Sequence, residues 1–192
     1  DLQPDTGINY KERFNEARMP KSAKLMKLIS DTGLKRKIYR ALPAYPNNLH
    51  FGGRVLVDRS GNLIITSGER SDLATRPQAQ QLNSGFGKII RITKEGQPAA
   101  GNPFLNQSGA RPEIYSYGHR NPQGLAFDSS GRLWQQEFGD GSLDETNLLE
   151  KGGNYGWSVN EGSHPFRPER PKGPGEFMPP LVEHAHSDFR SI

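Results

Sequence analysis

The stretch Val55-Leu-Val-Asp-Arg-Ser-Gly-Asn-Leu-Ile64 returns 70 residues later as Leu125-Ala-Phe-Asp-Ser-Ser-Gly-Arg-Leu-Trp134. In each copy an apolar segment runs into Asp-x-Ser-Gly, and a second apolar segment follows. Asp and Ser favour turns, and Gly adopts the left-handed backbone conformation that a tight reversal needs. Each copy therefore predicts a β-hairpin. Repeated antiparallel hairpins separated by long loops are typical of a β-propeller, with a β-sandwich as the alternative.

Composition favours the same all-β class. The chain has 192 residues, of which 22 are Gly and 15 are Pro. In a helix interior a Gly costs about 1 kcal/mol and a Pro about 3 kcal/mol, so a helical bundle is excluded. A chain of this length suits one domain. Many short strands joined by turns are expected.

The chain divides into a short arm and one long domain. Residues 1–21 are polar and aperiodic, which predicts an N-terminal arm or loop, and residues 22–192 form the predicted domain. At its start, residues 22–41 favour a hairpin, with a Lys-rich helix over 21–29 as the alternative. Residues 163–180 hold six Pro, which predicts an extended surface excursion and not a linker between domains.

Several function classes are excluded or weakened by residue content. The chain has no Cys, so a disulfide framework, a thiolate nucleophile and a Cys-ligated zinc site are excluded. No apolar run approaches the roughly 18 residues of a membrane span, and no signal peptide is present. The net charge is +4, but ten Lys or Arg against three acidic residues lie between Tyr10 and Arg40. This basic stretch has few aromatic residues, so nucleic-acid binding is only a remote alternative.

His50 and Glu69 are the first candidates for catalysis. His50 stands before a glycine pair at the entrance of the first repeated strand, and Glu69 follows the second strand of the same hairpin. Histidine has an ordinary pKa near 6.5 and can accept a proton at neutral pH, while a carboxylate can orient the imidazole. The alternative is a His that only stabilises a turn.

The densest polar cluster is Tyr117-Gly-His-Arg-Asn-Pro-Gln-Gly124, which precedes the second copy of the repeat. Arg120 offers a fork of donors to a carboxylate or an oxyanion, and Asn121 and Gln123 can both donate and accept. Because His50 and Arg120 hold equivalent places before repeated strands, we expect both loops to open on the same face. A capped turn with a surface Arg is the alternative.

An acidic segment follows the second copy. Residues 136–147 combine carboxylate and amide side chains with Gly residues, which suits calcium, a cation that prefers oxygen ligands. The spacing of an EF-hand is absent, and a solvated acidic turn is the alternative. His184 and His186 stand on alternate positions near Glu183, but such a pair more often lies on a surface than in a metal site.

Six short motifs occur in a fixed order along the chain: His50-Phe-Gly-Gly-Arg54, Gly68-Glu-Arg70, Gly87-Lys-Ile-Ile-Arg91, Tyr117-Gly-His-Arg-Asn-Pro-Gln-Gly-Leu-Ala-Phe127, Asn147-Leu-Leu149 and Gly153-Asn-Tyr-Gly-Trp157. Together they resemble one enzyme family, the soluble glucose/sorbosone dehydrogenases that depend on pyrroloquinoline quinone (PQQ). The resemblance covers roughly residues 22–192.

This resemblance implies a six-bladed β-propeller, of which the chain covers about half of the blades. It implies oxidation of the C1 hydroxyl of an aldose sugar to the lactone, with hydride transfer to the quinone. His50 would be the general base, Glu69 its supporting carboxylate, and Arg120 a catalytic group that stabilises the developing oxyanion. His50, Arg120, Asn121 and Gln123 would contact the quinone.

The resemblance also implies calcium. One ion would bridge the cofactor to main-chain carbonyls at Gly139-Asp140, where the family commonly has Gly-Pro. Asp144, Glu145 and Tyr155 would help form a second, structural calcium site. All five residues are therefore predicted metal ligands.

Further expectations follow from the same resemblance. The partners are an aldose sugar and an electron acceptor, with no nucleic acid and no membrane span. The location is periplasmic or secreted. Because the chain begins at Asp1 and covers part of a propeller, we expect a fragment or a processed chain that can self-associate through open sheet edges. The alternative function is a non-catalytic propeller that serves as a binding module.

Overall fold

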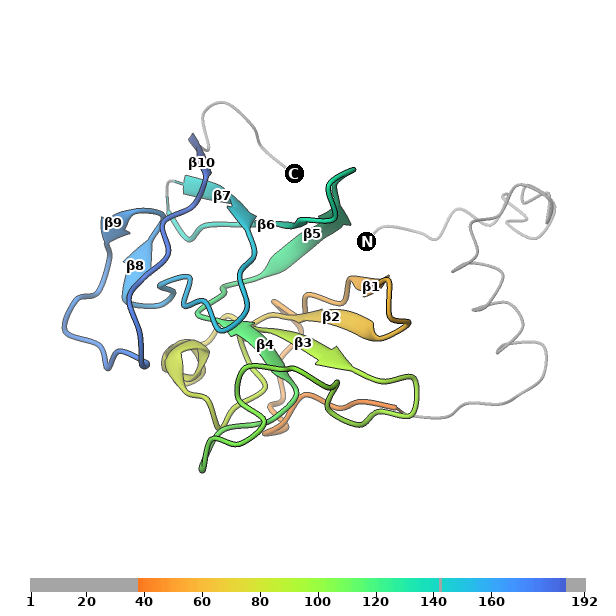
Figure 1. Ribbon diagram of the computed structural model, residues 1–192. Helices are drawn as coiled ribbons and strands as arrows, with labels where there is room; N and C mark the ends of the chain where they lie inside the picture. Colours follow the sequence, from red (N-terminus) through yellow and green to blue (C-terminus); the bar gives the residue numbers. More distant parts are fainter. Residues whose placement is uncertain (1–37, 142, 186–192) are drawn as a thin grey trace, which may run out of the picture. The chain divides into compact units, whose positions relative to one another are not determined.

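Both copies of the repeat form antiparallel β-hairpins (Figure 1). The computed structural model describes residues 38–141 and 143–185. The hairpin strands are β1 (Val55–Val57), β2 (Leu63–Ser67), β5 (Pro122–Phe127) and β6 (Leu133–Glu137). In the first copy Val57 pairs with Leu63, and the same pairing recurs 70 residues later. The predicted hairpins are confirmed.

The two turns are closed by the same physical device. The Oδ1 atom of Asp58 accepts hydrogen bonds from the backbone N–H groups two and four residues further on, at 2.8 and 2.9 Å. Asp128 does the same at 2.9 Å for both bonds. Gly61 and Gly131 each have φ at 81°, where a side chain would be strained. The Asp-x-Ser-Gly sequence thus dictates each reversal.

Further strands extend each hairpin into a four-stranded antiparallel sheet. The sheet orders are β1-β2-β3-β4 and β10-β7-β6-β5, and a separate two-stranded sheet pairs β8 with β9. Within the described residues there is no α-helix, only the 3₁₀ helix η2. The remaining elements are η2 (Arg76–Gln80), β3 (Lys88–Ile92), β4 (Ile114–Tyr117), β7 (Leu143–Leu148), β8 (Asn160–Glu161), β9 (His164–Pro165) and β10 (Val182–Ala185).

The apolar core lies on both faces of the first sheet. Side chains alternate along a strand, so Ile90 and Ile92 of β3 enter one cluster while Ile89 enters the other. The second cluster joins Ile64 of the first sheet to Leu133 of the second. Full burial of such a side chain contributes about 1.5–3 kcal/mol. Strands β1 and β2 also contact β5, so the two sheets meet through their repeated hairpins.

The segment after β9 leads the chain back to the second four-stranded sheet. Residues 166–181 contain no strand, and β10 then pairs with β7 to complete the second sheet. This agrees with the predicted excursion over residues 163–180. Residues 38–141 and 143–185 belong to one compact unit. No helix among them is long and apolar enough to cross a membrane.

The start of the predicted domain is only partly described. The boundary after residue 21 and most of the hairpin predicted over 22–41 lie outside the described residues. Of that hairpin, residues 38–41 are described and form no strand. On β1, which is the edge strand of its sheet, Val55 and Val57 are exposed. Self-association through open edges stays a prediction.

Candidate active site

The loops before β1 and β5 meet at one end of the two sheets. The backbone N–H of Glu69 donates to the carbonyl of Arg120 at 3.0 Å. The N–H of Gly52 donates to Oδ1 of Asn121 at 3.2 Å. Both loops therefore open on the same face, as the equivalent places of His50 and Arg120 predicted.

His50 is held against a buried carboxylate. Its Nδ1 lies 2.5 Å from Oε1 of Glu69, whose side chain is fully buried, while the His50 side chain is 14% exposed. The other oxygen of Glu69, Oε2, is buried and has no partner among the described residues. An imidazole that donates its Nδ1–H to a carboxylate presents Nε2 as an acceptor. The predicted pairing of His50 with Glu69 is present.

The backbone around this pair is strained. His50, Arg70 and Ser71 have φ at 51°, 76° and 56°, a region that residues other than glycine rarely occupy. Gly68 has no room for a side chain, because a Cβ there would lie 2.2 Å from the carbonyl oxygen of His50. Such strain persists where surrounding contacts enforce it and is commonly found at functional sites.

Arg70 supplies the enforcing contacts, a role that the sequence reasoning missed. Its Nη1 donates to the carbonyls of His50 at 2.8 Å and Gly68 at 2.6 Å. Its guanidinium lies 4.6 Å from the ring centres of both Phe51 and Phe86. Arg70 thus ties the backbone of His50 to the end of β2. Its signal in the sequence was only its place next to Glu69.

Arg120 belongs to a cluster of charges around Asp140. Nη2 of Arg120 donates to Oδ1 of Asp140 at 2.7 Å, and Arg76 of η2 grips both oxygens of the same carboxylate at 3.0 Å. Both guanidinium groups lie 5.4 Å from the ring centre of Trp157. Burial raises the pKa of Asp140, but the hydrogen bonds and charges of the two arginines outweigh it and hold the pKa below its ordinary value.

Asn121 and Gln123 link the two loops. Oδ1 of Asn121 accepts from Gly52 and, at 2.9 Å, from Nε2 of Gln123. The carbonyl of Gln123 accepts from Nε of Arg54 at 3.0 Å. The structure therefore brings together five predicted residues: His50, Glu69, Arg120, Asn121 and Gln123.

The Arg120 loop packs on three buried side chains, those of Glu137, His119 and Ser116. Oε2 of Glu137 accepts from the backbone N–H groups of Arg120 at 2.5 Å and Asn121 at 3.2 Å. Oε1 of Glu137 lies 2.9 Å from Nδ1 of His119, whose Nε2 lies 2.8 Å from Oγ of Ser116. The Ser-His-Glu order resembles a nucleophile with its base, but Ser116 and His119 are fully buried. Ser116 and His119 therefore hold Glu137, and Glu137 in turn holds the backbone of the Arg120 loop.

Lys88 supports η2, which carries Arg76. The side chain is fully buried, and its Nζ donates to three backbone carbonyls, those of Gln78 and Ala79 at 2.9 Å and Phe86 at 2.6 Å. Burial, with a smaller contribution from Arg111, lowers the pKa of Lys88 well below its ordinary value. Lys88 was part of a recognised motif, but its contacts were not predicted.

The predicted metal ligands have other partners in the structure. Gly139 N–H donates to Oδ1 of Asp144 at 2.9 Å, and both oxygens of Asp140 accept from arginines. Tyr155 donates to the carbonyl of Leu148 at 2.7 Å, and its ring stacks on His119. Within residues 38–141 and 143–185 no three His, Asp or Glu side chains form a group able to hold a metal ion. Calcium stays a prediction.

Glu145, another predicted ligand, lies in a row of carboxylates. It pairs across the strands with Glu137 of β6 and Glu183 of β10. Burial, followed by the charge of Glu137, raises the pKa of Glu145 to about 8. His184 lies on β10 with its Nε2 3.2 Å from Oγ1 of Thr146, while His186 lies outside the described residues.

Comparison with known proteins identifies the family. The sequence profile described as Glucose / Sorbosone dehydrogenase matches residues 12–184, and the chain belongs to this family. The aldose sugar dehydrogenase YliI of Escherichia coli is 46% identical over 125 residues, which are 65% of this chain and 33% of that protein. Quinoprotein glucose dehydrogenase B of Acinetobacter calcoaceticus is 40% identical over 124 residues, 56% of this chain and 26% of that protein.

Solved structures show the same relationship. The apo-form of the soluble aldose sugar dehydrogenase from Escherichia coli superposes with a TM-score of 0.67 at 39% identity, over 77% of this chain and 44% of that one. The PQQ-bound aldose sugar dehydrogenase from Streptomyces coelicolor gives 0.60 at 38% identity, over 74% and 38%. These enzymes are β-propellers, so the fold class is confirmed: the chain is a partial β-propeller. It spans about a third of the length of the Escherichia coli relative YliI.

Proposed function

We propose that this chain carries the catalytic base and part of the cofactor contacts of a sugar dehydrogenase that uses PQQ. One observation carries the proposal: the 2.5 Å contact between His50 and the buried Glu69, next to the Arg120 loop. Membership of the family supports it. So do the relatives named as a quinoprotein and as a PQQ-bound enzyme.

His50 is the proposed general base. Glu69 holds the Nδ1–H, so Nε2 is the atom that accepts the proton of the sugar C1 hydroxyl. A sugar hydroxyl is a weak acid, and a positioned base contributes typically about 10²–10⁴-fold to such a step. As the proton arrives, the Glu69 carboxylate stabilises the imidazolium that forms.

Arg120, Asn121 and Gln123 are the proposed cofactor contacts. A guanidinium and two amides suit the oxygens of an anionic quinone, and Nε of Arg120 is a buried donor with no acceptor among the described residues. When bound, PQQ supplies the acceptor for the two electrons that leave the sugar as hydride. Donors aimed at an oxygen that gains charge lower the barrier, and removing one such donor costs about 3–4 kcal/mol in well-studied sites.

For the calcium ion near the cofactor, the proposed protein ligands are main-chain carbonyl oxygens. The carboxylate of Asp140 is committed to Arg76 and Arg120, so an ion at Gly139-Asp140 would take backbone carbonyl oxygens. A structural ion at Asp144, Glu145 and Tyr155 is proposed on the family resemblance alone. The same resemblance supports a periplasmic or secreted location and a separate electron acceptor.

The test is reconstitution of the 192-residue chain. PQQ and calcium chloride are added, reduction of a dye by glucose is followed, and gel filtration shows whether quinone absorbance stays with the protein. We expect turnover in the unchanged chain, retained quinone but little turnover in His50→Gln, and loss of retained quinone in Arg120→Gln. If the unchanged chain neither turns over nor retains quinone, the non-catalytic binding module becomes the preferred function.

A further inference from the structure

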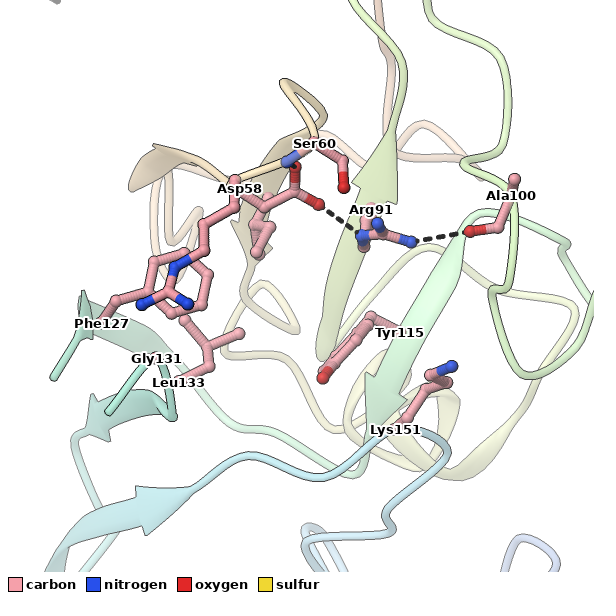
Figure 2. A pocket seen from close by; sticks show the side chains of 11 residues that line it. Asp58, Ser60, Arg91, Ala100, Tyr115, Phe127, Gly131, Leu133 and Lys151 are labelled. Atoms are coloured by element: carbon pink, nitrogen blue, oxygen red, sulfur yellow. Dashed lines mark hydrogen bonds and ion pairs between the residues drawn. The ribbon is translucent and has the colours of Figure 1, made fainter. Parts of the chain in front are cut away.

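A hollow lies beside the two Asp-x-Ser-Gly turns (Figure 2). These turns are at the other end of the hairpin strands from the loops that carry His50 and Arg120. The volume of the hollow is about 340 Å³. The two Asp-x-Ser-Gly turns border it, together with β3, β4 and the segment after β7. A volume of this size falls in the range of small-molecule sites, roughly 300–1,000 Å³. No function considered above uses this hollow.

Its lining carries three positive charges and one negative charge. Arg59 comes from the first turn, Arg91 from β3 and Lys151 from the segment after β7. The negative charge is Asp58, whose Oδ2 accepts from Nε of Arg91 at 2.8 Å. Although burial raises the pKa of Asp58, hydrogen bonds from Asn62 and Arg91 hold it below its ordinary value. Two positive charges remain in excess.

The excess charge is available to a ligand. Neither Arg59 nor Lys151 pairs with a carboxylate in the described part of the chain. The Arg59 guanidinium lies against Gly131 of the second turn, where a Cβ would be 3.1 Å from its Cζ, so the glycine makes room for it. Arg91 is held in place by Asp58 and by the carbonyl of Ala100 at 2.9 Å. The hollow thus has one cation that is paired, Arg91, and two, Arg59 and Lys151, that pair with no carboxylate among residues 38–141 and 143–185.

The floor of the hollow is apolar. Ile64 and Leu133 are core residues, 2% and 4% exposed, and the ring of Phe127 lies at the rim. Tyr115 also lines the hollow, and its hydroxyl is neutral at pH 7, since burial raises the pKa of this phenol further above its ordinary value of 10. Figure 2 shows Tyr115, Lys151 and Arg91 around the same space. A ligand here meets apolar surface and cations together.

We propose that this hollow binds a small organic phosphate monoester, with its ring or carbon skeleton against the exposed ring of Phe127 and its phosphate held by Arg59, Arg91 and Lys151. A carboxylate is satisfied by one arginine fork. A phosphate monoester carries about −1.5 to −2 charges at pH 7, which matches the excess of two cations. The exposed ring of Phe127 favours an organic ester over free phosphate.

The test uses calorimetric titration of the full chain with three probes: phenyl phosphate, inorganic phosphate and benzoate. Phenyl phosphate is expected to bind saturably and about ten-fold more tightly than inorganic phosphate, because its ring covers the exposed ring of Phe127. Benzoate, with the same ring and a single charge, is expected to bind more weakly than phenyl phosphate. Equal binding of benzoate would overturn the assignment to phosphate.

Charge variants locate the binding. The double variant Arg59→Gln with Lys151→Gln is expected to weaken phenyl phosphate binding by at least about ten-fold. The matched control, Arg167→Gln with Lys172→Gln, removes two exposed cations outside this lining and should leave binding unchanged. All four side chains are exposed, so circular dichroism should show unchanged folding. No saturable heat, or equal weakening in both double variants, would overturn the proposal.

Discussion

The two copies of the repeat place different chemistry at the same position. The equivalent residues, 70 positions apart, are His50 and Arg120, and each is held by a carboxylate from its own copy, Glu69 and Asp140. An imidazole can accept a proton near neutral pH, whereas a guanidinium stays charged. One hairpin scaffold thus presents a proton acceptor and the other a permanent cation. The repeat builds the frame, and single residues within it decide the chemistry.

The two copies also differ in the side chains that hold the backbone of their loops. Position 137 is Glu, which accepts from two backbone N–H groups of the Arg120 loop. The equivalent position in the first copy is Ser67, whose Oγ is buried without a partner among the described residues. The first copy instead uses Arg70, which donates to the carbonyls of its loop. A carboxylate holds one loop by its N–H groups, and a guanidinium holds the other by its carbonyls.

The largest expected effect is on the rate of sugar oxidation, and it distinguishes the role of His50 from that of Arg120. His50→Gln removes the proposed proton acceptor, so under the proposed function the rate of glucose oxidation by the chain loaded with PQQ and calcium should fall by about 10²–10⁴-fold. Arg120→Gln should act mainly on cofactor affinity, so that added PQQ restores part of the rate. Dye reduction at several PQQ concentrations measures both. If excess PQQ rescued His50→Gln instead, His50 would act through cofactor binding and not as the general base.

The next effect concerns positions 67 and 137. Glu137→Gln replaces a charged acceptor of two backbone N–H groups with an amide that can turn a donor towards them. It should lower the free energy of unfolding by about 2–4 kcal/mol. Ser67→Ala removes a hydroxyl that has no partner and should change it by less than about 1 kcal/mol. Urea unfolding of the two variants measures the contrast, and equal costs would refute it.

Asp140 provides a pH-dependent effect of intermediate size. Asp140→Asn should lower the free energy of unfolding by about 1–2 kcal/mol at pH 7, because the hydrogen bonds to Arg76 and Arg120 lose the carboxylate charge. The folded pKa lies below the ordinary value of 3.8. The carboxylate's contribution is therefore full above pH 3.8 and is lost as the pH falls through the folded pKa.

The measurement is urea unfolding of both proteins between pH 7 and pH 3. The gap in unfolding free energy between the unchanged chain and Asp140→Asn should narrow as the pH falls. A gap that stays constant over this range would show that the charge of Asp140 contributes nothing to folding.

The smallest effect compares the two turns. Asp58 pairs with Arg91 of another strand, and both side chains are largely buried. The cation that pairs with Asp128 is Arg132 of its own turn, which is 58% exposed, and Asp128 also accepts from Nε1 of Trp134 at 2.9 Å. Exposed pairs contribute little. Asp58→Asn should cost about 1 kcal/mol, and Asp128→Asn should cost less. Thermal unfolding of the two variants measures the difference, and the reverse order would contradict it.

Much of the site could be predicted because the repeat has a regular geometry. His50 and Arg120 each precede the first strand of a repeated hairpin, which predicts that they lie on one face. Glu69 follows the second strand of the first hairpin, which predicts that it lies beside His50. The roles of Arg70, Arg76 and Glu137 could not be found this way. Their contacts join segments that are far apart in the chain or depend on a strained backbone, and no local pattern specifies them.

By itself, the sequence determined the all-β class, the two hairpins and the face on which the loops open. Turn chemistry and alternation act over a few residues, so they can be read locally. Only the tertiary structure decided that Asp140 is bound by two arginines, that Lys88 is buried among carbonyls, and that a cationic hollow lies beside the two Asp-x-Ser-Gly turns. These features depend on which segments meet when the sheets pack. The energy of a buried charge is set by those neighbours and not by its own place in the chain.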